Sequence, residues 1–302
     1  MEFYQGAWPT MVTPLDEKLN IDRDGYIALI DWYISHGAGG LYANCATSEM
    51  DILSADEQMV LVQDAVLTSD GRVPVAATGN MGTTIDEQVT LCQSVADAGA
   101  DIVMLVVPAG NMNDDDLERY FMTFAETVSS PFGIYEWPIA GMRHLNVDLV
   151  GKLARTGRFL AYKETSCDIG KLGEILRVTD STPLALLQAN IPYLLPFIKA
   201  GGRGTMSISS AFVPDLVDAV IKSALAEESR VESLHQALCV MDLVQRAVHP
   251  AGTKYLLQKR GVPMASRTRR IPHDLTPEQR YALDYTAAEW FDTNGELRVL
   301  NE

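Results

Sequence analysis

Lys163 is the residue whose type and position point most directly to chemistry. It follows the apolar run 159–162, which has the composition of a buried strand. In such surroundings an amine loses hydration, so its ammonium form is disfavoured, its pKa falls and the free amine can attack a ketone to form a Schiff base. The alternative is that the ammonium pairs with Glu164 or with another carboxylate nearby. Position alone does not decide between the two interpretations.

Tyr135 is the natural partner of this amine. It lies in the apolar run 132–138, and its phenol can point toward the same space as Lys163 if the two runs are neighbouring strands. Schiff-base formation needs a proton donor and acceptor beside the carbinolamine, and a tyrosine can fill that role. Taken alone, an aromatic residue near a strand end more often belongs to the core, so its interpretation depends on Lys163.

Eight short apolar runs, each bounded by turn residues, must position these side chains. They cover residues 7–14, 40–45, 74–79, 102–108, 132–138, 159–165, 184–190 and 205–210. Segments with helical spacing lie between them, so each run with its helix is one strand–helix unit. Eight such units predict a closed (β/α)8 TIM barrel of the α/β class rather than an open doubly wound sheet. The carboxyl ends of the strands then converge on one mouth.

The helices carry signals of their own. Segments 54–57 and 84–87 have the form of capping boxes. In the first predicted helix Ile27, Ile30 and Ile34 fall on one stripe, and Gly37 supplies a left-handed stop.

The alternation of strand and helix stops after the eighth run. Segment 214–226 can be the eighth helix of the barrel, and further helices are predicted at 228–248, 252–259 and 277–293. No linker rich in proline or glycine separates these helices from the barrel. We therefore expect a barrel over residues 1–227 and a C-terminal helical extension over 228–302 that packs on it.

Composition narrows the function classes. Forty acidic residues against 24 basic ones give a formal charge of −16, which disfavours nucleic-acid partners and anionic membranes. The N-terminal segment 1–5 lacks the pattern of a signal peptide, so a cytoplasmic protein is expected. The glycine runs 37–40 and 201–204 precede strands rather than follow them, so no phosphate loop is predicted and non-phosphorylated small molecules are favoured.

These residues resemble one known family. The chain is similar to the dihydrodipicolinate synthase/N-acetylneuraminate lyase family, which comprises class I aldolases and related dehydratases on a (β/α)8 barrel with a helical extension. The similarity rests on Val-Thr-Pro at 12–14, Tyr-Glu-Trp-Pro at 135–138, where the family has Tyr-Asn-x-Pro, and Tyr-Lys-Glu at 162–164. The resemblance implies that Lys163 is the Schiff-base lysine and Tyr135 the proton shuttle. It also implies catalysis without a cofactor, in a homo-oligomer, either a tetramer or a dimer.

The expected carboxylate-binding turn is atypical. Residues 45–49 read Cys-Ala-Thr-Ser-Glu, where relatives have Gly-Ser/Thr-Thr-Gly-Glu. In the family this turn binds the carboxylate of a 2-oxo acid through backbone N–H groups and hydroxyls, and we expect Thr47 and the amides around Ser48 to do so here. Ala46 lacks the hydroxyl that links to the tyrosine in many relatives.

Other departures concern the substrate. The synthases have an arginine where this chain has Ala140, and their tyrosine after strand 4 is replaced near Ala109. Sialic-acid lyases have acidic residues after strand 7, where this chain has Asn190 between two apolar residues. We therefore predict a lyase, either an aldolase or a dehydratase, for a 2-keto-3-deoxy sugar acid or a similar pyruvate-yielding compound. The alternatives are dihydrodipicolinate synthase proper and a catalytically impaired relative that binds a keto acid.

Four further residues complete the expected substrate site. Asn190 ends the seventh run, and Met206 belongs to the eighth. Glu136 is expected to act as an acid/base, to bind substrate hydroxyls or to pair with Arg143, which lies on the following loop and can also reach a substrate acid group.

A metal centre is the alternative within enzymes. Glu49, Glu136 and Glu164 could converge on a divalent ion. Their spacing is not diagnostic, and His144 is the one histidine expected on the reactive face. The metal-free amine mechanism is therefore preferred.

Overall fold

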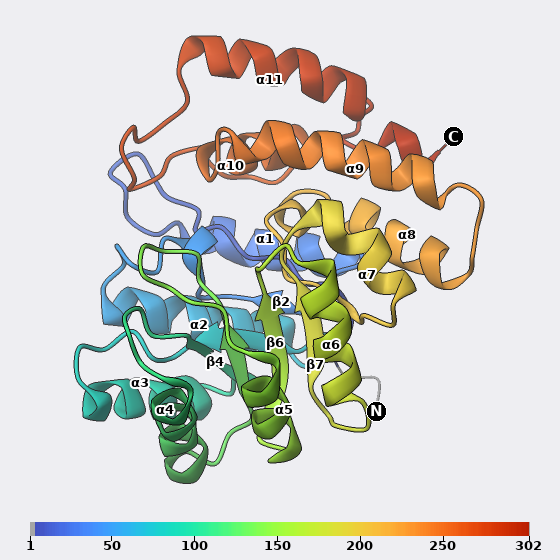
Figure 1. Ribbon diagram of the computed structural model, residues 1–302. Coiled ribbons are helices and arrows are strands. Elements are labelled where there is room, and N and C mark those ends of the chain that lie inside the picture. Colours follow the sequence, from blue (N-terminus) through green and yellow to red (C-terminus); the bar gives the residue numbers. More distant parts are fainter. Residues whose placement is uncertain (1–3, 302) are drawn as a thin grey trace.

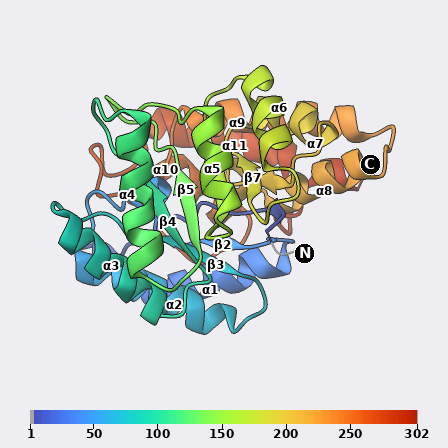
Figure 2. The same cartoon turned by 60° about the horizontal axis from the view of Figure 1, so that its bottom comes forward.

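The computed structural model describes residues 4–301, and it contains one parallel sheet curled into a ring (Figures 1 and 2). Residues 1–3, which belong to the N-terminal segment interpreted above, lie outside the described residues. The strands are β1 (Gly6–Ala7), β2 (Leu41–Tyr42), β3 (Val75–Thr78), β4 (Ile102–Val106), β5 (Phe132–Tyr135), β6 (Phe159–Glu164), β7 (Ala185–Gln188) and β8 (Gly204–Thr205). Each falls within or beside a predicted run, and the ends of the runs form the loops of the mouth.

The ring closes between its first and last members. Each strand pairs in parallel with the next from β2 to β8, and β8 pairs with β1. Isolated parallel bridges join Ala7 to Ala38 and Thr10 to Tyr42, so the β1 segment also contacts the β2 segment. The predicted (β/α)8 barrel is confirmed.

Glycines make this closure possible. A Cβ atom on Gly204 would overlap the backbone of Gly6, and one on Gly39 would overlap the carbonyl oxygen of Gln5. Gly39 precedes β2 and Gly204 is the first residue of β8, and the two glycines bring β2 and β8 close to the β1 segment. These runs therefore serve backbone packing at the amino-terminal side of the barrel.

Helices cover the outside of the strands (Figure 2). They are α1 (Arg23–Ser35), α2 (Ala55–Ser69), α3 (Ile85–Asp97), α4 (Asp114–Thr127), α5 (Val147–Arg155), α6 (Ile169–Thr179), α7 (Leu194–Lys199) and α8 (Pro214–Leu225). Ser54 and Thr84 begin α2 and α3 with complete capping boxes, as predicted.

The isoleucine stripe on α1 coincides only in part with the buried face of this helix. Ile27 is 38% exposed, and the buried face is formed by Tyr26, Leu29, Ile30 and Tyr33. The bulky tyrosines fill the space against the barrel, which the spacing of isoleucines did not reveal.

The inside and the outside of the barrel form two separate cores. Trp8, Tyr42, Met104 and Tyr135 belong to the inner core, whereas Tyr162 belongs to the larger core between strands and helices. Because successive side chains of a strand point to opposite faces, neighbours in sequence reach different environments.

The C-terminal helices lie over one end of the ring (Figure 1). They are α9 (Val231–Arg246), α10 (Ala251–Lys259) and α11 (Pro277–Trp290). Arg260, after α10, donates to both carboxylate oxygens of Asp215 in α8, at 2.9 and 2.6 Å, which fastens this part to the barrel. In residues 4–301 no helix is long and apolar enough to cross a membrane.

A substitution at the closure tests the role of the glycines. We expect Gly204→Ala to lower the free energy of unfolding by about 2 kcal/mol or more, because the added methyl group has no space. Gly173→Ala, in α6 with nothing within 4 Å of its Cβ position, should raise it by about 0.5–1 kcal/mol. Urea denaturation of both variants measures the difference, and equal midpoints would contradict the close approach.

Candidate active site

Lys163 points into the barrel beside two aromatic rings. It is the register partner of Tyr135 on the neighbouring strand β5. Its Nζ atom lies 4.2 Å from the centre of the Tyr135 ring and 5.3 Å from that of Tyr42. The side chain is buried, with 5% of the residue exposed. Adjacent strands therefore hold the amine and the phenol side by side, as predicted.

Burial sets the charge of this amine. Desolvation lowers the pKa of Lys163 to about 8. The buried or half-buried lysines that form ion pairs are Lys171 and Lys254, and in the part of the chain that the structure describes no ion pair involves Lys163. A substantial fraction of the amine is therefore neutral near physiological pH, which a nucleophile requires.

The proposed pairing of Lys163 with Glu164 does not occur. Glu164 lies on the opposite face of β6, where it accepts hydrogen bonds from the Ser166 N–H group at 2.7 Å and from Gln188 at 3.3 Å. Burial raises the pKa of Glu164. The strand alternation thus separates the amine from the carboxylate next to it in sequence.

The two tyrosines beside the amine differ in their hydroxyl contacts. The Tyr42 hydroxyl is hydrogen-bonded to Thr78 at 2.8 Å, and the two rings contact edge to face. Tyr135 lines the cavity in front of Lys163. Burial raises the pKa of Tyr135 well above its usual value, so the phenol stays protonated and can donate a proton.

A cavity of about 480 Å³ opens in front of the amine. Its lining includes five of the eight predicted site residues, namely Thr47, Tyr135, Lys163, Asn190 and Met206. The remainder of its lining consists of Ala46, Trp137, Pro138, Thr165, Ala189, Ile208, Arg246, His249, Pro250 and Arg270. Ser48, Glu136 and Arg143 are not part of this lining.

The turn after β2 borders this cavity. Ala46–Ser48 forms a short 3-10 turn, whose first N–H groups have no acceptor within the turn itself. Thr47 faces the cavity and donates to the Thr10 hydroxyl at 3.1 Å. The Ser48 hydroxyl instead lies 2.8 Å from the Met11 carbonyl oxygen and 2.7 Å from that of Ala43. Ser48 therefore shapes the turn from behind.

Glu49 fastens the C-terminal segment to this turn. Its carboxylate accepts from the Thr268 hydroxyl and from the Arg270 N–H group at 2.9 Å, and it lies 3.5 Å from the Lys254 amine. Burial lowers the pKa of Lys254 to about 8 although Glu49 opposes the shift. Glu49 therefore does not converge with Glu136 and Glu164, which the sequence left open as an alternative metal site.

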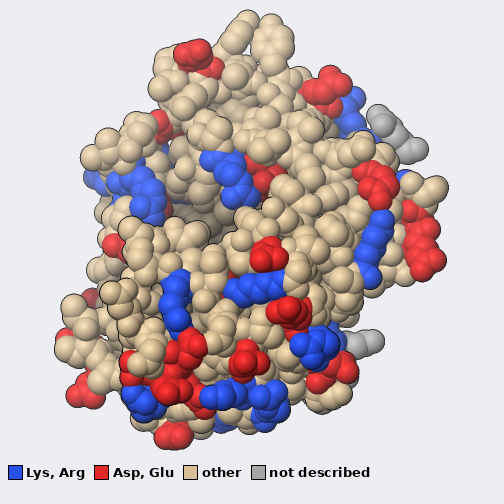
Figure 3. Space-filling model, viewed as in Figure 1, with Lys and Arg blue, Asp and Glu red and all other residues tan. Residues whose placement is uncertain are grey.

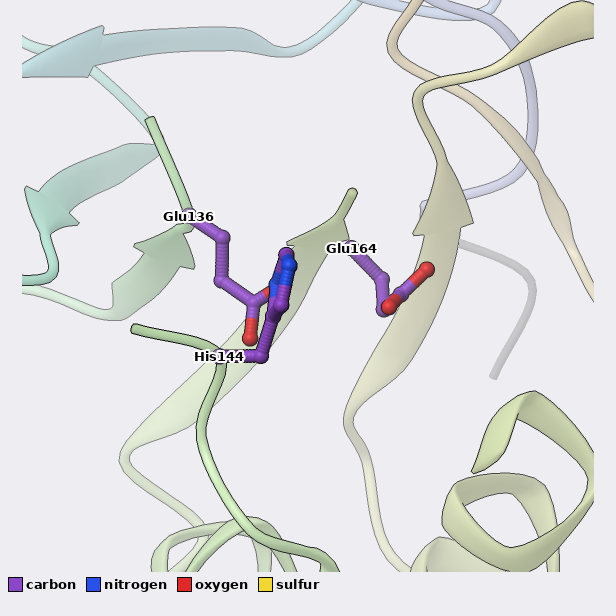
Figure 4. Close-up of side chains that lie close together, drawn as sticks. All are labelled: Glu136, His144 and Glu164. Atoms are coloured by element: carbon purple, nitrogen blue, oxygen red, sulfur yellow. The ribbon is translucent and has the colours of Figure 1, made fainter. Parts of the chain in front are cut away.

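Glu136 is not part of the cavity lining, and its side chain lies beside that of His144 (Figure 4). Its carboxylate accepts from the Leu145 N–H group at 2.8 Å and from the Tyr162 hydroxyl, and it pairs with the imidazole of His144 at 2.8 Å. Burial alone would raise the pKa of Glu136, but His144, Lys171 and Tyr162 together shift it downward. Glu136 is thus an ionised group that its surroundings already satisfy.

Glu136, His144 and Glu164 do bring one ligand atom each within 4.8 Å of one another. The hydrogen bonds described above already engage the oxygens of both carboxylates, so we interpret this group as a polar network of the outer core.

Arg143 does not pair with Glu136 as considered above. Its guanidinium contacts Asp114 at the start of α4. Asp114 also accepts from the amide of Asn146. The loop after β5 therefore contacts the start of α4, and Arg143 lies outside the cavity lining.

Sequence reasoning missed the residues that the C-terminal region contributes. Arg246 ends α9, His249 and Pro250 precede α10, and Arg270 follows it, yet all four line the cavity. His249 contradicts the expectation that His144 is the one histidine of the reactive face. Trp137 had a signal, because it follows Tyr135 in the motif at 135–138. The other four gave none, because contacts so distant in sequence leave no local pattern.

A parallel (β/α)8 barrel with a buried amine and a phenol facing one cavity is typical of class I aldolases. The family model of the dihydrodipicolinate synthetase family matches residues 4–288. The 4-hydroxy-tetrahydrodipicolinate synthase of Bacillus velezensis is 31% identical over 92% of this chain and 96% of its own, and that of Bacillus subtilis is 30% identical over 92% and 97%. The chain belongs to the dihydrodipicolinate synthetase family and is an enzyme of the class I aldolase type.

Solved structures agree with this fold. Dihydrodipicolinate synthase DapA-2 of Bacillus anthracis has a TM-score of 0.86 at 26% identity, covering 94% of this chain and 98% of its own. YagE of Escherichia coli, a prophage protein of the same family in complex with pyruvate, has a TM-score of 0.87 at 23% identity with the same coverage.

The charge of Lys163 can be measured directly. In a ¹³C NMR titration of the lysine Cε atoms we expect two signals with midpoints near pH 8, from Lys163 and Lys254, charged below that pH and neutral above it. An exposed lysine titrates at about pH 10.4. Lys163→Met should remove one signal and Lys254→Met the other. A Lys163 amine that keeps its proton up to pH 10 would contradict the role of burial.

Proposed function

We propose that this enzyme forms an imine between Lys163 and a non-phosphorylated 2-oxo acid, with a 2-keto-3-deoxy sugar acid as the substrate class. The observation that carries the proposal is the buried amine with its lowered pKa, next to Tyr135 and open to a cavity. YagE, a relative in fold, was solved with pyruvate. We therefore choose pyruvate as the first ligand to test at this site.

The substrate carboxylate is assigned to the turn at residues 46–48. Ala46 and Thr47 of this turn line the cavity, the first N–H groups of the turn have no acceptor within it, and no acidic residue of the described chain is part of the lining. The ketone of the same substrate then lies against Lys163. Asn190, whose backbone N–H is held by the Gln188 side chain at 2.8 Å, borders the remaining chain with Met206.

The reaction then follows from the chemistry of the imine. The Nζ atom attacks the ketone carbon, two proton transfers release the carbonyl oxygen as water, and a protonated C=N bond remains. Tyr135 supplies and takes back these protons. In retro-aldol cleavage the C3–C4 electrons move into the imine, the C4 hydroxyl loses its proton and an aldehyde leaves. Water then hydrolyses the enamine and releases pyruvate.

Dehydration uses the same intermediate. Loss of a C3 proton gives the enamine. The C4 hydroxyl then takes up a proton and leaves as water, which forms a C3–C4 double bond conjugated with the imine, and hydrolysis of this imine frees Lys163. Both routes need an electron sink of the same kind, so the site serves either.

The second candidate is 4-hydroxy-tetrahydrodipicolinate synthase itself. The relatives of that name at 31% and 30% identity favour it. The sequence departures at Ala46 and Ala140 favour the first. An assay for formation of 4-hydroxy-tetrahydrodipicolinate distinguishes the two. We also propose a homo-oligomer, which sedimentation would test.

Imine formation can be trapped. Incubation with pyruvate and borohydride should add one reduced adduct, located by peptide mass mapping on Lys163. Lys163→Arg should lose the adduct, because a guanidinium is not nucleophilic. Lys254→Arg is the matched control, since Lys254 is an equally buried lysine that does not line the cavity. Adducts on Lys254, or none at all, would refute the proposal.

If Tyr135 transfers protons, removal of its hydroxyl should lower kcat more than removal of the Tyr42 hydroxyl. Tyr135→Phe should lower kcat by about 100-fold or more, because the proton transfers of the carbinolamine lose their shuttle. Tyr42→Phe removes a hydroxyl that is bonded to Thr78 and should lower kcat by less than about tenfold. Turnover of 2-keto-3-deoxy acids, followed by pyruvate release and by dehydration, measures both. Equal losses in the two variants would remove Tyr135 from the mechanism.

A further inference from the structure

The roof of the cavity carries two guanidinium groups. Arg246 and Arg270 line it from the C-terminal region, and Lys163 lines it from the barrel. Among the lining residues in the described part of the chain there is no aspartate or glutamate. This is the reverse of the whole chain, whose formal charge is −16. Figure 3 shows the hollow below the C-terminal helices with basic side chains near it.

Each guanidinium is held from one side by a carboxylate. Arg246 donates to Asp242 through Nε at 3.3 Å and Nη2 at 2.9 Å. Asp242 is buried and also accepts from the Ser209 hydroxyl at 2.7 Å, so α9 is joined to the loop after β8. Arg270 donates to Asp51 at 2.6 Å through Nη2. A guanidinium has five N–H donors, so both arginines retain donors for a ligand.

The two arginines are fixed in advance. The backbone N–H of Arg270 donates to the buried carboxylate of Glu49 at 2.9 Å, which holds this segment at the edge of the mouth. Arg246 is fixed by Asp242 on the same helix. Groups that are already ordered lose little conformational entropy when a ligand binds.

The protonation of His249 reflects the positive electrostatic potential at this end of the cavity. The pKa of His249 is lowered to about 3. Burial is the largest cause, and the positive charges of Arg246, Lys254, Arg270 and Lys163 contribute to the same shift. The imidazole is therefore neutral at physiological pH. This end of the cavity is an environment that repels a cation and attracts an anion.

We propose that Arg246 and Arg270 bind a second acid group at the far end of the substrate, which is then a dicarboxylic 2-oxo acid. The inference rests on the proposed function, because it takes the 2-oxo acid end to lie between Thr47 and Lys163. A carboxylate accepts hydrogen bonds from guanidinium N–H groups in a planar, often bidentate geometry. Arginine is the residue suited to such recognition.

The test compares two 2-oxo acids of equal length. The protein is incubated with 2-oxoadipate or with 2-oxohexanoate, which differ in having a carboxylate or a methyl group at the far end, and the imine is trapped with borohydride. The concentration for half-maximal trapping should be lower for the diacid by a factor of about ten or more. Hydrogen bonds to charged groups are stronger than those between neutral groups, and the monoacid lacks them. Trapping needs no turnover, so the natural substrate need not be known.

Substitutions of the two arginines test whether they cause the preference for the diacid. Arg246→Gln and Arg270→Gln should each reduce the preference for the diacid severalfold, and Arg246→Lys should retain part of it. Arg119→Gln is the control, because Arg119 is an exposed residue of α4 paired with Asp116; it should keep the full preference. Thermal melting of each variant verifies folding.

The outcomes separate the two proposals. If pyruvate gives no adduct on Lys163, the proposed function fails. If pyruvate is trapped but both six-carbon acids reach half-maximal trapping at the same concentration, the inference is overturned while the proposed function stands. A preference that persists in both glutamine variants also overturns it.

Discussion

The site depends on one physical constraint: an amine must be kept out of water without a carboxylate beside it. The barrel meets this constraint with the strand period of two, which turns Lys163 inward and Glu164 outward. The same alternation places Glu136 behind β5, where His144, Tyr162 and the Leu145 N–H group satisfy it. A carboxylate on the inner face would pair with the amine and hold its proton.

Charge is arranged differently at different scales. The chain as a whole is strongly acidic, yet the cavity is lined by Lys163, Arg246 and Arg270. The carboxylates that pair with the two arginines are not part of the lining. Asp242 and Asp51 neutralise part of the guanidinium charge and fix its direction. The potential that a ligand meets is therefore set by a few ordered contacts and is not given by net charge.

Much of this arrangement could be predicted from the sequence, because it is local. The runs of strand type, the capping boxes and the neighbouring positions of Tyr135 and Lys163 follow from patterns within one or two elements. The partners of Glu136 could not be predicted, because His144 and Leu145 reach it from the loop after β5. Arg246 and Arg270 could not either, because they reach the mouth through contacts with Asp242 and Glu49 that no periodicity encodes. The assignment of catalytic and binding roles remains a prediction.

The attachment of the C-terminal segment at Glu49 has an evolutionary consequence. The groups at the floor of the cavity come from strands β5 and β6, whereas much of its roof comes from residues 246–270, and the buried carboxylate of Glu49 joins this roof to the turn after β2. Substitutions in the roof therefore do not alter the side chains that β5 and β6 contribute. Descendants of such a scaffold can diversify what they accept while inheriting a fixed reaction centre.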